Sequence, residues 1–107
     1  MYAMELIKTL NNEFFNVLKK VNLSMYNNLD ELVNDCMQET AINVYEDLSI
    51  DDLYTVAYKD INEKIRSGQF ESLNEICVEV CIEYLESTID LVKVNNYLKD
   101  KNEVYTE

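Results

Sequence analysis

The chain contains no proline and only one glycine, Gly68, among its 107 residues. Tight turns and strand bulges depend on these two residue types, so their scarcity disfavours an all-β fold. Apolar residues instead recur at steps of three and four, which is the period of an amphipathic helix. We therefore predict an all-α protein, a compact bundle of about four helices with a long C-terminal helix, in a single domain over residues 1–107.

The first half of the chain contains two predicted helices. Residues 2–20 form the first, and the turn-prone segment 22–28 follows it as a loop. Asn28 with Glu31 has the spacing of an N-cap, which begins a second helix that runs from residue 29 to about 46. The inward seam of the first helix comprises Ala3, Ile7, Leu10, Phe14, Val17 and Val21, with Leu6 and Leu18 beside it.

The second half is expected to contain two more helices. Ser49 with Asp52 begins the third, and Gly68 ends it as a left-handed C-terminal residue. The fourth begins within residues 69–72, where Ser72 with Glu75 has the spacing of a capping box. It runs to about residue 98, on the order of 40 Å. Its seam comprises Leu73, Cys77, Val80, Tyr84, Ser87, Leu91, Val94 and Leu98. Its wide apolar arc makes it the central element and leaves a homodimer as an alternative, while residues 99–107 should fray.

The charge balance restricts the partners of this protein. The formal net charge is −12, and the chain has no histidine. Direct binding to nucleic acid or to an anionic membrane is disfavoured, because phosphate contacts require lysine and arginine. No segment approaches the ~20 consecutive apolar residues of a transmembrane helix, and the first ten residues do not resemble a signal peptide, so a cytoplasmic location is expected.

Fourteen of the 21 acidic residues lie in two windows that contain no lysine or arginine, the first between Lys20 and Lys59 and the second between Arg66 and Lys93. Such windows produce a strong negative field, for which the natural partner is a cationic protein surface. We therefore predict that twelve of these carboxylates bind the partner. The first window contributes Asp30, Asp35, Glu39, Glu46, Asp47, Asp51 and Asp52, and the second contributes Glu75, Glu79, Glu83, Glu86 and Asp90.

The second window has the spacing of a charged stripe. Glu75, Glu79 and Glu83 follow one another at four-residue steps on a predicted helix, so their carboxylates rise about 6 Å apart. Two nucleotide steps along one strand of duplex DNA rise about 6.8 Å. This similarity favours mimicry of a phosphate backbone. The alternative is a solvated helix face whose charge only promotes solubility.

Catalysis and metal binding are less well supported. Asp51 with Asp52 and Glu46 with Asp47 lie at predicted helix ends, without the pocket that catalytic carboxylates need. Segment 47–60 lacks the central glycine of a calcium loop. Without histidine neither a serine–histidine nor a cysteine–histidine site can form. Cys36, Cys77 and Cys81 are an odd number on apolar faces and are expected to be reduced, buried thiols, so we predict no cofactor and no metal site.

These features together indicate a binding protein and not an enzyme. We expect it to inhibit a nucleic-acid-handling protein, such as a nuclease or a CRISPR effector, by occupying its basic groove. In size, charge and composition the chain resembles the small acidic antagonists, such as anti-CRISPR and anti-restriction proteins, that phages and mobile elements make against host nucleases. Two alternatives remain at this stage: an immunity protein or antitoxin that neutralises a cationic toxin, and a structural or regulatory helical dimer.

Overall fold

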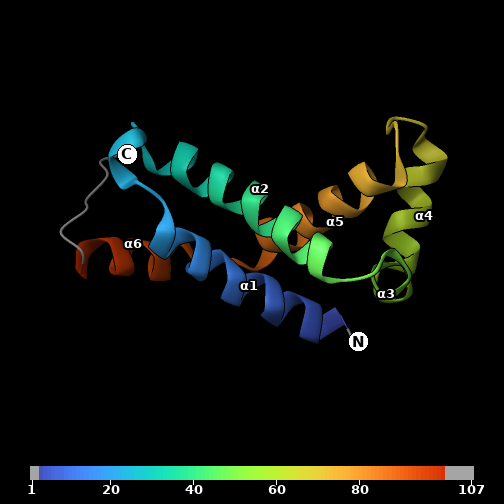
Figure 1. Cartoon of the computed structure of the whole chain (residues 1–107), viewed down its shortest axis with the longest axis horizontal. Coiled ribbons are helices and arrows are strands. Elements are labelled where there is room, and N and C mark those ends of the chain that lie inside the picture. The colour runs from blue at the N-terminus through green and yellow to red at the C-terminus, as the bar shows by residue number, and fades with distance from the viewer. Residues whose placement is uncertain (1–2, 101–107) are drawn as a thin grey trace.

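Helices account for nearly all of the described chain, which in the computed structural model comprises residues 3–100. No strand occurs within that range, so the all-α prediction is confirmed, but there are six α-helices where about four were expected. The elements, shown in Figure 1, are α1 (Ala3–Lys20), the short 3-10 helix η1 (Leu23–Met25), α2 (Leu29–Asp47), α3 (Ile50–Val56), α4 (Tyr58–Ser67), α5 (Leu73–Thr88) and α6 (Leu91–Asp100).

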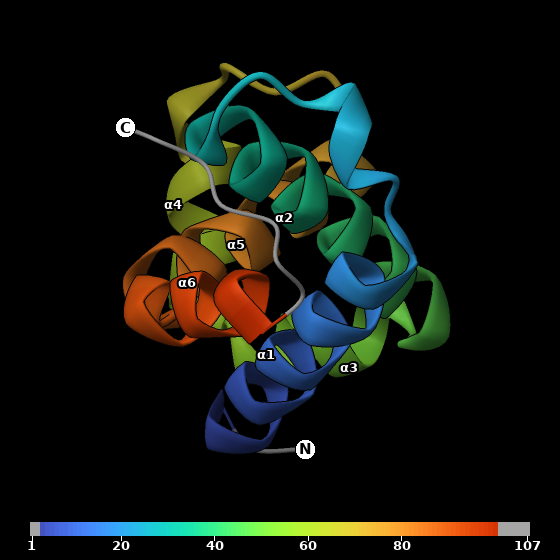
Figure 2. The same cartoon turned by 90° about the vertical axis from the view of Figure 1, so that its left-hand side faces the viewer.

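The helices form an elongated molecule of 44 × 27 × 20 Å. Helices α1, α2 and α5 pack against one another in its middle, and α3 with α4 pack on α5 at one end. Helix α6 lies at the other end, and none of the closely packed helix pairs includes it. Figure 2, a view along the long axis, shows α1, α2 and the α5–α6 chain arranged around a common centre. Within residues 3–100 no helix is long and apolar enough to span a bilayer.

The apolar stripe predicted on the first helix forms part of the core. Leu6, Leu10 and Phe14 are fully buried in α1, and Val17 and Leu18 nearly so. Ala3 belongs to the predicted seam but is exposed, because α1 begins there.

The predicted caps begin three of the helices. The side chains of Asn28, Ser49 and Ser72 each accept a hydrogen bond from the backbone N–H three residues later, at 2.9, 3.1 and 3.1 Å. Gly68 ends α4 with a φ of 68°, a conformation that residues with a Cβ rarely adopt. These local signals were sufficient to place four helix ends from the sequence.

The third predicted helix is divided into α3 and α4 at Ala57. Its φ of −118° and ψ of 35° depart from helical values, although its N–H still donates to the Leu53 carbonyl at 2.9 Å. The Tyr54 ring meets the Tyr58 ring edge to face at 5.0 Å, and the Tyr54 hydroxyl donates to Asn62 Oδ1 at 2.8 Å. These contacts connect the two helices across the bend, which neither glycine nor proline marks.

The prediction of one long C-terminal helix is also wrong, because this part of the chain forms two helices, α5 and α6. The hydroxyls of Ser87 and Thr88 donate to the Tyr84 carbonyl at 3.1 and 2.6 Å, and Ile89 is extended. Asp90 then begins α6, since its Oδ1 accepts hydrogen bonds from the N–H groups of the second and third residues that follow, at 2.9 and 3.3 Å. Residues 99 and 100, expected to fray, belong to α6, and the remaining predicted tail, 101–107, lies outside the described residues.

This division changes the inward face of the fourth predicted helix. Leu73 and Leu91 are exposed at 37% and 49%, Ser87 is exposed and Tyr84 is half-buried, although all four were assigned to the seam. The fully buried side chains of α5 include Leu85, which lies outside the predicted seam. The predicted seam was therefore right in part, since Cys77, Val80, Val94 and Leu98 are buried. Leu91 was misplaced because a straight helix through residues 89 and 90 was assumed. The core residues of these helices are Ile76, Cys77, Val80, Cys81, Leu85, Val94 and Leu98.

This register can be tested by two leucine truncations. Leu85→Ala should lower the free energy of unfolding by about 2–5 kcal/mol, because it opens a cavity among fully buried side chains. Leu91→Ala should cost less than about 1 kcal/mol, because half of that side chain already meets solvent. Chemical denaturation followed by circular dichroism measures both. Equal losses would contradict the observed register.

Candidate functional site

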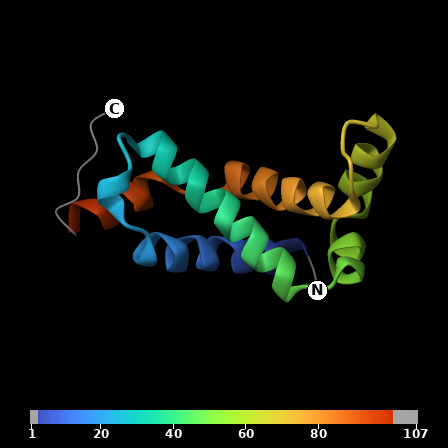
Figure 3. The same cartoon turned by 45° about the horizontal axis from the view of Figure 1, so that its top comes forward.

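Helices α2 and α5, neither of which contains lysine or arginine, pack against each other (Figure 3). The sequence windows therefore become neighbouring helices. All their carboxylates are exposed except Glu79, which is half-buried. Helix α2 carries Asp30, Glu31, Asp35, Glu39, Glu46 and Asp47, and α5 carries Glu75, Glu79, Glu83 and Glu86.

The cations of the described chain lie on other helices. Helix α1 carries three of them, α4 carries three and α6 carries two. Lys19 of α1 and Lys93 of α6 line one hollow of about 400 Å³ together with Phe15 and Tyr97. The Lys93 ammonium lies 5.0 Å from the centre of the Phe15 ring. Within residues 3–100, lysine and arginine are thus confined to α1, α4 and α6, which also carry acidic residues.

Two of the carboxylates predicted to bind a partner also cap helices. Glu75 Oε2 accepts the backbone N–H of Glu71 at 3.2 Å, which completes a capping box with Ser72. Asp90 caps α6 through the hydrogen bonds described above and lies on neither helix, so the predicted stripe does not continue to it. Both contacts stabilise helix starts, and neither carboxylate is the most suitable position for a test of binding.

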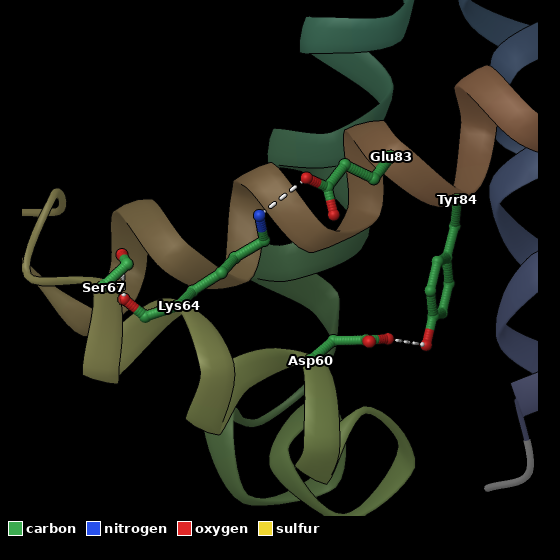
Figure 4. Close-up of polar contacts among 5 residues, drawn as sticks. All are labelled: Asp60, Lys64, Ser67, Glu83 and Tyr84. Carbon is green, nitrogen blue, oxygen red and sulfur yellow. Dashed lines mark hydrogen bonds and ion pairs between the residues drawn. The ribbon is translucent and has the colours of Figure 1, made fainter.

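The stripe on α5 is interrupted at Glu83, whose Oε1 lies 2.6 Å from Lys64 Nζ (Figure 4). Lys64 comes from α4 and also lies 5.3 Å from the centre of the Phe70 ring. Because the Glu83 side chain remains 46% exposed, the pair adds little stability, but it partly neutralises this carboxylate. The second window contains no lysine or arginine in its sequence, but the fold brings Lys64 of α4 next to it.

A second polar contact joins the same helices. The Tyr84 hydroxyl of α5 donates to Asp60 Oδ2 of α4 at 2.9 Å (Figure 4). Burial, and then the hydrogen bond to Asp60, raises the pKa of Tyr84 to about 12.

This shifted pKa predicts a specific sensitivity to alkali. In the unfolded chain Tyr84 loses its proton near pH 10, but in the folded protein it keeps the proton until about pH 12. The stabilisation it provides is therefore complete below pH 10 and is lost as pH rises to about 12. The stability advantage of the natural protein over Tyr84→Phe should shrink across that interval in urea denaturation. A constant difference would contradict the assignment.

Members of both acidic windows line one groove of about 360 Å³, between the first half of α2 and the joint of α5 with α6. Among residues 3–100, no lysine or arginine lines this groove. It could not be found from the sequence, because it depends on the break at residues 89–90. Its main lining residues are Asp30, Val33 and Met37 from α2, and Glu86, Ile89 and Leu91 from the α5–α6 chain.

The other predicted residues lie elsewhere. Glu46, Asp47, Asp51 and Asp52 surround the connection between α2 and α3, where the two aspartates of α3 occupy its first turn. Asp47 lines a separate hollow of about 250 Å³ between α1 and α2. Asp35 accepts a hydrogen bond from Tyr26, whose pKa is raised by burial and then by this contact. The twelve carboxylates therefore do not gather at one site.

The three cysteines lie in the core and not at a site. All three are buried and free of disulfides. Burial raises the pKa of Cys36 to about 11 and that of Cys81 to about 12, and it also raises the pKa of Cys77. Protonated thiols are poor nucleophiles and poor metal ligands. Among residues 3–100 no three Cys, Asp or Glu side chains are grouped so that they could hold a metal ion.

Comparisons with protein-family models, curated proteins and solved structures found no match.

Thiol labelling tests this account of the cysteines. In the folded protein, iodoacetamide at about pH 8 should leave Cys36, Cys77 and Cys81 unmodified, because the reactive thiolate is scarce and shielded. In guanidinium chloride all three should react. Mass spectrometry counts the adducts. Rapid labelling of one thiol in the folded protein would reveal a reactive cysteine that the burial does not explain.

Proposed function

We propose that this protein binds a cationic surface on another protein and inhibits that protein by occupying a groove meant for DNA or RNA. The observation that supports the proposal most is the packing of α2 against α5, which places two helices without cations side by side. A nuclease or CRISPR effector has a basic groove of the required kind. The protein would then act in the cytoplasm of a host cell, as the small acidic antagonists of phages and mobile elements do.

The unpaired negative charge destabilises the folded chain but favours binding to a cationic partner. A net charge of −12 repels itself within a molecule only 20 Å thick along its shortest axis. A single ion pair, between Lys64 and Glu83, reaches the carboxylates of α2 and α5 within the described chain. Charge left unpaired in this way accelerates association with a cationic partner and selects against anionic ones. Binding, and not catalysis, is the activity that such a surface favours.

Charge reversal on the two helices tests this proposal. The protein is immobilised and exposed to host lysate, and the partners retained at about 0.1 M salt should be nucleic-acid-binding proteins that elute at about 1 M, where screening is strong. Asp35→Lys with Glu39→Lys on α2, and Glu79→Lys with Glu86→Lys on α5, should each weaken retention strongly.

The control pair is Glu5→Lys with Glu63→Lys, which changes the net charge equally on α1 and α4. Both control positions are exposed. Circular dichroism shows which variants remain folded. Equal effects of all three pairs would leave the charge as a solubility device, and retention of one cationic toxin would favour an immunity protein instead.

A further inference from the structure

The groove between α2 and the α5–α6 joint is lined by both carboxylates and apolar side chains. Asp30 and Glu86 line it, and neither carboxylate has a hydrogen bond or an ion pair to another side chain within residues 3–100. They come from helices 56 residues apart in sequence numbering, and the fold brings them to the same hollow. Both can therefore accept hydrogen bonds from an incoming donor.

The remaining lining of the groove is largely apolar. Ile89 and Leu91 contribute from the joint, and Val33 and Met37 from α2, where Asn34 adds an amide. Val33 and Met37 are almost fully buried, so the exposed apolar surface comes mainly from the joint. Leu91 is 49% exposed, and its neighbour Val92 is 67% exposed. Apolar side chains that stay exposed beside carboxylates would be covered by a ligand with an apolar stem and a cationic head.

Arginine fits this combination better than lysine does. Its planar guanidinium presents several N–H donors that can pair with two carboxylates, and it is weakly hydrated. Its methylene stem can lie along Ile89 and Leu91 while the head reaches toward the carboxylates of Asp30 and Glu86. A lysine ammonium is a compact and strongly hydrated charge, and it loses more on entering a partly apolar groove.

We propose that this groove receives an arginine side chain of the partner protein. The inference rests on the proposed function for the identity of the partner as a cationic protein. It specifies in addition the residue type that is recognised and the place where it binds. A second copy of this chain is not the occupant, because it would bring further carboxylates of a −12 protein against Asp30 and Glu86.

Three short peptides serve as probes, acetyl-Gly-X-Gly-amide with X as arginine, lysine or citrulline. Citrulline keeps the shape of arginine and removes its charge. Each is titrated into the ¹⁵N-labelled full chain, and amide shifts are followed by NMR. The arginine peptide should produce saturable shifts confined to residues 30–37 and 86–92. The lysine peptide should bind at least about fivefold more weakly, and the citrulline peptide should cause no saturable shift.

Variants identify the groups responsible. Asp30→Asn with Glu86→Gln should abolish the saturable shifts, whereas Glu5→Gln with Glu63→Gln, which removes the same charge elsewhere, should preserve them. Leu91→Ser should weaken binding without a change of charge, and Leu91 is exposed enough for the fold to tolerate it. Shifts spread over all of α2 and α5, equal binding of arginine and lysine, insensitivity to the double variant, or no binding at all would each overturn the proposal.

The peptide experiment does not use the natural partner. If it fails while host nucleic-acid-binding proteins are still retained through α2 and α5, only the groove assignment falls. If it succeeds while no such protein is retained, the groove binds arginine but the proposed inhibition of a nucleic-acid-handling protein is wrong.

Discussion

The burial of one face of α5 is the packing interaction on which the rest of the molecule depends. This helix packs against α1, α2, α3 and α4. Its buried residues include two cysteines and a valine, Cys77, Val80 and Cys81, whose small volumes let the helix approach closely to its neighbours. Without these buried contacts, the packing that joins α3 and α4 to α1 and α2 through α5 would be lost.

The same packing determines where charge can be placed. The solvent-facing sides of α2 and α5 carry their acids, because their other sides are buried against each other and against α1. Helix α6 joins the core through the buried Val94 and Leu98 and the partly buried Tyr97, and a groove lies on either side of it. One groove contains Asp30 and Glu86, and the other contains Lys19 and Lys93. The loose attachment of α6 therefore produces two recessed surfaces of opposite charge.

The sequence predicted the helix caps correctly, but it did not predict the helix breaks or the contacts between helices. Asn28, Ser49, Ser72 and Gly68 acted as predicted, because a cap depends on the few residues around it. The bend at Ala57 was missed, because the heptad-like spacing of apolar residues continues through it.

The joint at residues 89–90 was missed for a different reason. Ser87, Thr88 and Asp90 do signal a helix end and a new start, but the apolar positions around them were given more weight. The consequence was an incorrect register for Leu91. Neither the pairing of Lys64 with Glu83 nor the meeting of Asp30 with Glu86 could be read from sequence distance, because each depends on how separate helices pack.

The central claim is that α2 and α5 compete with nucleic acid for one cationic groove. The most direct test is a titration of this protein into a retained partner that already holds a fluorescently labelled oligonucleotide. The account predicts that the oligonucleotide is released as the complex forms, and that raising the salt concentration weakens this competition. A stable ternary complex of partner, oligonucleotide and this protein would contradict it.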